Sequence, residues 1–164
     1  MLLLGGTLKL TGTGPVIRGA MVSAAAVSGG TLDCGGQKTS GILIDTGAGT
    51  VVDGVKVVNC LAGAVHYSHG RPNVLVRSQV QGSDRRCLWA QSLSRLLVVD
   101  SELSGCTMDG IDMDSHDSLG NHTHDNKRYW VFLRGGGQAQ RRGRQPDRGE
   151  RQGGTRAAST RTAR

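Results

Sequence analysis

The chain of 164 residues is long enough for one domain with a sizeable core, and its 26 glycines and scarce aromatics argue against a helical bundle. Its net charge of +7 would suggest a nucleic-acid-binding protein, but residues 134–164 carry nine arginines against two acidic residues, while residues 1–133 hold eleven basic and eleven acidic side chains. The body of the chain is therefore neutral, and its charge gives no reason to expect a nucleic-acid partner.

Residues 1–13 are expected to form a poorly defined N-terminal segment. The run MLLLGGTLKLTG begins with three consecutive leucines after Met1, but it has no basic region and its glycines interrupt the apolar stretch. These features match neither a signal peptide nor a transmembrane span. The segment predicts no membrane partner, and it leaves the localisation open.

Strand-like stretches recur at a steady spacing through the next part of the chain. They are GILID from Gly41, GAVHY from Gly63, RCLWA from Arg86, GIDMD from Gly110 and WVFLR from Trp130, and they begin 22, 23, 24 and 20 residues apart. In each stretch the second and fourth residues are mostly apolar, as a strand with one buried face requires. This alignment places His66 and Trp89 in the core, where His66 would be a hydrogen-bonded core residue rather than a catalyst.

A second ladder of strands lies between these stretches. It consists of GVKVVNC from Gly54, NVLVRSQV from Asn73 and RLLVVDSEL from Arg95. Two interleaved ladders with a coil of about 22 residues are typical of a solenoid, in which each coil buries its apolar face only against its neighbours. A β-sandwich also has short strands, but it does not predict matching strands at a steady period. We therefore predict an all-β parallel solenoid of about five coils over residues 14–133.

The repeats VVDGVKVVNCLAGAVHYS and CTMDGIDMDSHDS resemble those of right-handed parallel β-helix proteins, the pectin-lyase-like superfamily of pectate lyases, polygalacturonases and mannuronan C5-epimerases. TLDCGG at residues 31–36 is similar to an early coil of such proteins, and DNKRYWVFL is similar to a later repeat in which Trp130 stands where a glycine is expected. The resemblance implies a right-handed β-helix that binds an extended, acidic polysaccharide along an outer sheet. It also implies an extracellular or secreted parent protein.

The stretch GIDMDSH at residues 110–116 suggests where such a site would lie. With Ile111 and Met113 inward, Asp112 and Asp114 would face outward, roughly 6–7 Å apart along the strand, and His116 would follow them. We expect the outer face of this sheet to gather Asp45, Tyr67, Asp112, Asp114 and His116. Asp112, Asp114 and His116 are the predicted catalytic residues, and Asp45 and Tyr67 are the predicted substrate-binding residues.

Several chemistries remain open for this set. Uronate lyases and epimerases need a base and an acid, which His116 and Tyr67 would supply, whereas glycoside hydrolases need two carboxylates, such as Asp112 and Asp114. The run from Asp114 to His116 resembles the Asp-Pro-His motif of mannuronan epimerases, with Ser115 in place of the proline. The carboxylates would also suit Ca²⁺, given further oxygen ligands. The alternatives are that Asp114 and His116 only cap a coil corner, and that the domain is a non-catalytic carbohydrate-binding or structural module or an inactive fragment.

The cysteines and one histidine pair give little indication of a metal or redox site. The cysteines are 26, 27 and 19 residues apart, a spacing that fits no zinc or redox motif; they are Cys34, Cys60, Cys87 and Cys106. Buried free thiols are therefore expected, with one or two disulfides as the alternative in an exported protein. His122 and His124 are expected in an exposed loop rather than at a metal.

After Leu133 the sequence contains no Val, Ile, Leu, Met or Phe, so residues 134–164 cannot form a core and are expected to be a disordered Arg/Gly-rich tail. The tail also lacks aromatic residues, which disfavours nucleic-acid binding through base stacking. A back-translation read one base later has solutions such as KHNVVVGNRIEGN, which would form another coil. The preferred hypothesis is that a frame change ends the solenoid near Arg134.

Overall fold

The computed structural model describes residues 2–3, 5–70, 72–93, 96–113, 117–119 and 121–133. The expected tail at residues 134–164 lies outside these residues, as do the predicted site residues Asp114 and His116. The described residues form strands and no helix. A membrane-spanning helix is therefore absent from this part of the chain.

The strands are short and follow one another at regular intervals. They are β1 (Leu2–Leu3), β2 (Thr7–Lys9), β3 (Ile17–Ala20), β4 (Ala26–Ser28), β5 (Thr31–Gln37), β6 (Ile42–Gly47), β7 (Thr50–Asp53), β8 (Lys56–Cys60), β9 (Val65–Gly70), β10 (Asn73–Val76), β11 (Gln79–Gln81), β12 (Leu88–Leu93), β13 (Leu96–Val99), β14 (Glu102–Ser104), β15 (Ile111–Met113), β16 (Asp117–Leu119), β17 (His122–His124) and β18 (Val131–Leu133).

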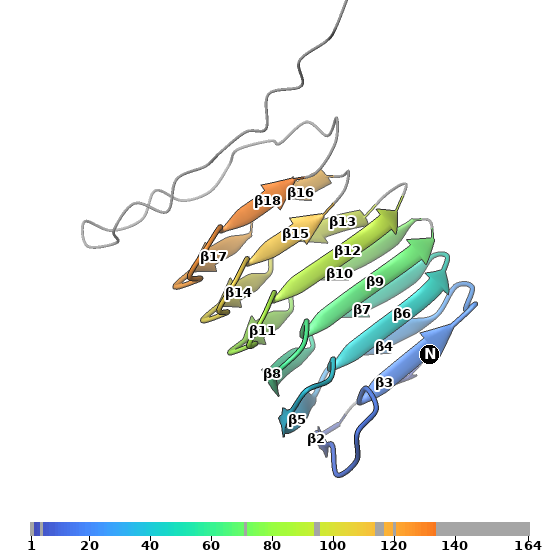
Figure 1. Ribbon diagram of the computed structural model, residues 1–164. Helices are drawn as coiled ribbons and strands as arrows, with labels where there is room; N and C mark the ends of the chain where they lie inside the picture. Colours follow the sequence, from blue (N-terminus) through green and yellow to red (C-terminus); the bar gives the residue numbers. More distant parts are fainter. Residues whose placement is uncertain are drawn as a thin grey trace, which may run out of the picture.

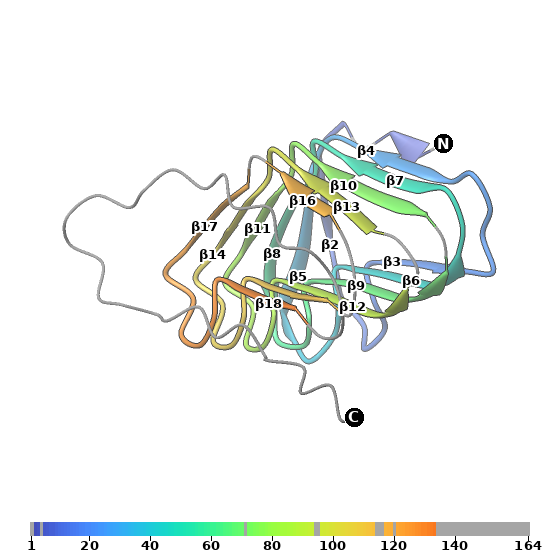
Figure 2. The same ribbon diagram turned by 90° about the horizontal axis from the view of Figure 1, so that it is seen from above.

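Three parallel sheets form the walls of the molecule. Sheet A has the order β1-β4-β7-β10-β13-β16, sheet B has the order β2-β5-β8-β11-β14-β17, and sheet C has the order β3-β6-β9-β12-β15-β18. The chain visits sheets C, A and B in turn, so each circuit stacks one strand onto each wall (Figures 1 and 2). The result is a parallel β-solenoid of about five turns, which confirms the predicted fold class. The second predicted ladder combined strands that belong to two different walls, sheets A and B.

The register of sheet C corrects the predicted alignment. Ile42, Val65, Leu88, Ile111 and Val131 are aligned on successive strands and point inward. The prediction placed the two central coils one residue out of register, and a shift of one residue exchanges the two faces of a strand.

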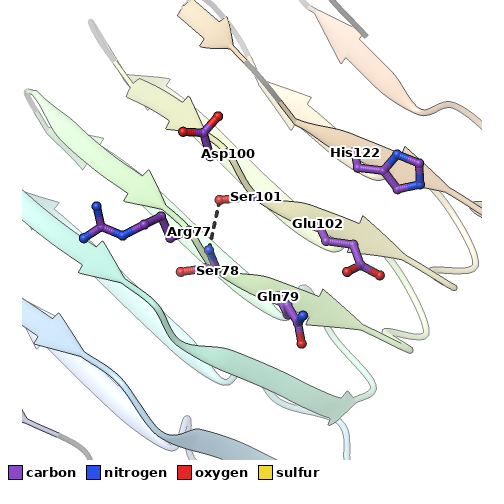
Figure 3. Close-up of a pocket in the computed structure, with 7 residues that line it drawn as sticks. All are labelled: Arg77, Ser78, Gln79, Asp100, Ser101, Glu102 and His122. Carbon is purple, nitrogen blue, oxygen red and sulfur yellow. Dashed lines mark hydrogen bonds between the residues drawn. The ribbon is translucent and has the colours of Figure 1, made fainter. Parts of the chain in front are cut away.

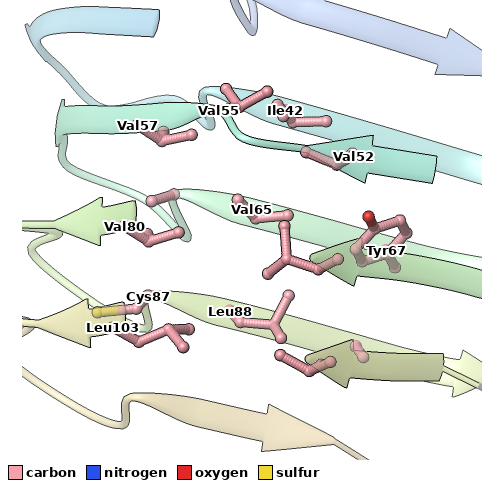
Figure 4. Packing of buried hydrophobic residues seen from close by; sticks show 14 of the residues in the cluster. Ile42, Val52, Val55, Val57, Val65, Tyr67, Val80, Cys87, Leu88 and Leu103 are labelled. Atoms are coloured by element: carbon pink, nitrogen blue, oxygen red, sulfur yellow. The ribbon is translucent and has the colours of Figure 1, made fainter. Parts of the chain in front are cut away.

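Tyr67 is the clearest consequence of this shift. It was expected on the outer face, but its side chain is fully buried in the core (Figure 4) and its hydroxyl donates a hydrogen bond to the carbonyl of Val74, 3.3 Å away. Burial raises the pKa of Tyr67 far above its usual range. His66 and Trp89 were expected in the core, and they lie instead on the outer face of sheet C.

The corner between sheets A and B is held by a ladder of serine side chains. The backbone N–H of Val55 donates to Ser78 Oγ at 3.2 Å, and the N–H of Ser78 donates to Ser101 Oγ at 3.2 Å. The N–H of Ser101 then donates to Asn121 Oδ1 at 2.9 Å. Each hydroxyl also donates to a carbonyl of its own coil, so these buried polar groups are paired within the wall.

The cysteines form two disulfides, Cys34–Cys60 and Cys87–Cys106, with Cα–Cα distances of 4.9 and 5.7 Å. All four side chains are fully buried beside the apolar core. The preference for free thiols is therefore wrong, and the alternative of two disulfides holds.

Candidate functional site

The outer face of sheet C carries one continuous row of side chains from β3 to β18, here called the outer column. It consists of Arg18, Leu43, His66, Trp89, Asp112 and Phe132. Neighbouring strands lie about 4.8 Å apart, so the column is roughly 24 Å long. It runs across the strands, along the axis of the solenoid.

His66 and Trp89 form the centre of the outer column. Their rings are stacked, with centroids 4.3 Å apart and an interplanar angle of 11°. The guanidinium carbon of Arg86 lies 4.8 Å from the centroid of the Trp89 ring, within the range of a cation–π interaction. Burial lowers the pKa of His66 and outweighs the opposing effect of a hydrogen bond to Gln91. The imidazole is therefore neutral at pH 7.

A network of charges borders the outer column at the corner between sheets B and C. Arg128 holds Asp109 with two hydrogen bonds, one of them from Nε to Oδ1 at 2.8 Å. Arg86 Nε makes an ion pair with Asp112 and lies 3.7 Å from Asp109 Oδ2, although neither contact has the geometry of a hydrogen bond. Both carboxylates are fully buried, and the hydrogen bond to Asp109 raises the pKa of Arg128. The two arginines therefore neutralise the two aspartates.

A second aromatic pair lies at the C-terminal end of the outer column. The rings of Tyr129 and Phe132 are stacked with centroids 5.2 Å apart, and the guanidinium carbon of Arg128 lies 5.5 and 5.7 Å from their centroids. Arg128 thus connects this aromatic pair to Asp109, as Arg86 connects Trp89 to Asp112. The same combination of arginine, aspartate and aromatic ring occurs twice along the corner.

The structure separates the predicted site residues. Asp112 lies on the outer column, as expected, but it is buried. Asp45 also lies on sheet C, three strands away on β6 and two residues further along its strand, so it is more than about 14 Å from Asp112. That separation exceeds the roughly 5–9.5 Å between the two carboxylates of glycosidases. Tyr67 is in the core, and Asp114 and His116 are outside the described residues, so the described residues do not assemble the predicted catalytic set.

Sequence reasoning missed Arg86, Asp109 and Arg128. The signal that was present is a charged residue shortly before each of the strands β12, β15 and β18, at the end of the corner from sheet B. These residues became a network only because the coils stack in register, which places each corner against the next.

A shallow pocket of about 310 Å³ lies at the corner between sheets A and B (Figure 3). It is lined by Arg77, Ser78, Gln79, Asp100, Ser101, Glu102 and His122. The two serine hydroxyls are already engaged in the serine ladder. The pocket therefore presents mainly flexible charged side chains to a ligand.

The histidine pair near this pocket lies on strand β17 and not in the expected loop. His124 Nε2 is 3.2 Å from Glu102 Oε1, and its Nδ1 is 2.8 Å from Asp125 Oδ2. Burial lowers the pKa of His124, but the hydrogen bonds to Asp125 and Glu102 outweigh this effect and the pKa is raised. Among the described residues, no three His, Cys, Asp or Glu side chains are arranged to hold a metal ion.

Comparison of the chain with protein-family models, with curated proteins and with solved structures found no match. The fold and the geometry of sheet C therefore carry the functional assignment.

Proposed function

We propose that this chain is a β-solenoid that binds an extended polysaccharide along the outer column of sheet C, in the manner that its resemblance to pectin-lyase-like repeats implies. The observation that carries the proposal is the stacked His66–Trp89 pair, partly exposed in the middle of a column roughly 24 Å long. A row of this length suits a linear polymer better than a compact small molecule.

The side chains around this pair have the chemistry that sugars require. Ser68 and Gln91 lie on strands β9 and β12 in register with Asp45 on β6, next to the outer column, and they offer hydroxyl and amide groups to sugar hydroxyls. Arg18 is exposed at one end of the column. Its guanidinium favours an acidic polysaccharide over a neutral one.

Binding is tested by measuring the affinity of the purified full chain for neutral and uronate-containing polysaccharides. W89A is expected to weaken binding roughly tenfold, because aromatic side chains dominate such contacts, whereas W89F keeps a ring and should retain most of the affinity. H122A, on the outer face of sheet B, is the matched control and should bind as the wild type does. If no polysaccharide binds, or if H122A weakens binding as much as W89A does, the proposal is wrong.

A second candidate function is that the chain acts on the polysaccharide that it binds, with Asp112, Asp114 and His116 as the catalytic residues. The observation in its favour is that Asp112 pairs with Trp89 in the outer column; its buried carboxylate is ion-paired with Arg86, which would have to move aside for a substrate to reach it. A lyase would release unsaturated uronate ends, which absorb in the ultraviolet. D112N is expected to lose this product while it retains binding. Binding without any change in the polymer would leave the non-catalytic module as the function.

A further inference from the structure

Both disulfides lie at the corner between sheets B and C, and each joins two successive coils. Cys34 on β5 is bonded to Cys60 at the end of β8, and Cys87, just before β12, is bonded to Cys106, just after β14. The sequence contains four cysteines, and all of them are used. The first disulfide therefore staples one pair of coils, and the second staples the next pair.

The packing around the sulfur atoms closes this corner to reagents. All four cysteine side chains have no exposed surface. A methyl group built on Gly41 would lie 3.3 Å from Cys60 Sγ and 2.3 Å from a methyl of Val57, so there is no room for even one added carbon atom. Exchange of a disulfide requires a thiolate to reach one of its sulfur atoms. That approach is closed once the coils have stacked.

We infer that the two disulfides are made while the coils assemble, by exchange with the oxidised dithiol of a thiol–disulfide oxidoreductase, and that the chain matures in a compartment that supports this exchange. In each exchange a cysteine thiolate attacks the disulfide of the oxidant, and the second cysteine displaces the mixed disulfide. The two thiols of the chain lose two protons and two electrons in total, and the disulfide of the oxidant is reduced to two thiols. Such bonds persist in oxidising compartments and are rare where thiols are kept reduced.

The positions of the bonds also divide the solenoid. Strands β8 and β11 pair at the contact between the two stapled pairs of coils, and no cysteine remains to cross it. Apolar packing such as that of Val57 against Val80 holds this contact together with the backbone hydrogen bonds (Figure 4). The oxidised chain therefore contains two disulfide-linked units, which can separate from each other only between β8 and β11, while the outer contacts β2–β5 and β14–β17 also lack a disulfide and can fray independently.

The pairing can be read from peptides of the full chain. The protein is made in an oxidising compartment, denatured, alkylated without reduction and digested with trypsin. Each cysteine lies on its own tryptic peptide: residues 19–38, 57–77, 87–95 and 96–127, because Arg71 precedes Pro72 and resists cleavage. Two linked species are expected, 19–38 with 57–77 and 87–95 with 96–127, and no alkylated cysteine. Four alkylated cysteines, or linkage between other peptides, would overturn the inference.

Two double variants distinguish the loss of a particular disulfide from the loss of any two cysteines. C34A/C60A removes one disulfide and should leave no free thiol, whereas C34A/C87A removes both and should leave two, on Cys60 and Cys106. These two residues are two coils apart, about 10 Å, which is too far for a bond between them. Each variant lacks two sulfur atoms, but C34A/C87A should have the lower Tm, by roughly 10 °C. Equal thiol counts or equal Tm values in the two variants would contradict the inference.

A reductant challenge tests whether the bonds are sealed. The native protein, kept in dithiothreitol without denaturant and then alkylated, should retain both bonds, while the same treatment in urea should expose four thiols. If the native protein is reduced as fast as the unfolded chain, the bonds are not enclosed by the coils. A chain made in a reducing compartment with four free thiols and an unchanged Tm would show that oxidation is no part of its maturation.

Discussion

The imidazole of His66 lies against the indole of Trp89, with ring centroids 4.3 Å apart and planes 11° from parallel. The stacked rings exclude water from the imidazole, and this burial is the main reason that the pKa of His66 falls below its ordinary value. A lowered pKa means that the folded chain prefers the neutral imidazole. The stability that His66 contributes is therefore present above the unfolded pKa of about 6.5 and is lost as the pH falls through the folded pKa.

This relationship can be checked by an NMR titration of the histidine side chains. The midpoint of His66 is expected below about 6.5, and in W89A it should return towards that value because water then reaches the ring. W89F keeps an aromatic ring against the imidazole and should leave the midpoint low. A midpoint at or above the ordinary value in the wild type would contradict the prediction.

His124 should respond to pH in the opposite direction. Its partners Glu102 and Asp125 raise its pKa, so the stability that it contributes is fully present below the unfolded pKa of about 6.5 and is lost as the pH rises through the folded pKa. H124N should therefore destabilise the chain more at about pH 5.5 than at about pH 8.5, as measured by urea unfolding. A pH-independent effect of H124N would argue against charged contacts with the two carboxylates.

The D109N substitution is expected to destabilise the chain by roughly 2–4 kcal/mol, because it leaves Arg128 without its buried charged partner. The estimate is below that for a fully buried pair, since the Arg128 side chain is 41% exposed. Asp84 is an exposed carboxylate on the preceding coil corner, and D84N should change the unfolding free energy by less than about 0.5 kcal/mol. Equal effects of the two substitutions in urea unfolding would show that Asp109 is not held as described.

Gly110 should tolerate no side chain. A Cβ atom at this position would lie 2.6 Å from the carbonyl oxygen of Trp130 and 2.7 Å from Asn126 Nδ2, so the next coil would have to move. G110A is expected to cost at least about 2 kcal/mol through overpacking. G63A is the matched control at the same corner, where the nearest atom would lie at an ordinary 3.7 Å. Thermal unfolding should show a large fall in Tm for G110A and a small one for G63A.

The sequence was sufficient to predict the solenoid, because apolar residues alternate within each strand and the strands recur at a steady spacing. It was not sufficient to predict which side chains point inward in β9 and β12. In GAVHY and RCLWA, at least three of the four residues after the first are apolar or aromatic, so either register satisfies the alternation. Backbone pairing resolves the ambiguity by placing Val65 and Leu88 inside, and this exchange moves Tyr67 into the core and His66 onto the surface.

The disulfides and the charge network could not be predicted for a different reason. Cys34 and Cys60, like Arg86 and Asp109, are more than 20 residues apart, and they meet only after the coils have stacked. The spacing of residues along the chain does not show which side chains of neighbouring coils will contact one another. The individual carboxylate Asp112 was placed correctly on the outer column because its own strand has unambiguous alternation.

The chain between sheets B and C is longer in one coil than in the others. The aligned residues Thr31 and Ile42 are 11 residues apart, whereas the corresponding pairs Lys56 and Val65, Gln79 and Leu88, and Glu102 and Ile111 are each 9 apart. The two extra residues are accommodated where β5 shifts its register against β8 between Asp33 and Gln37, while β6 and β9 remain aligned in sheet C. A loop inserted at this corner would extend beside the face that carries Trp89 while sheet C stays paired, so new recognition specificities could be grafted onto this scaffold at one edge.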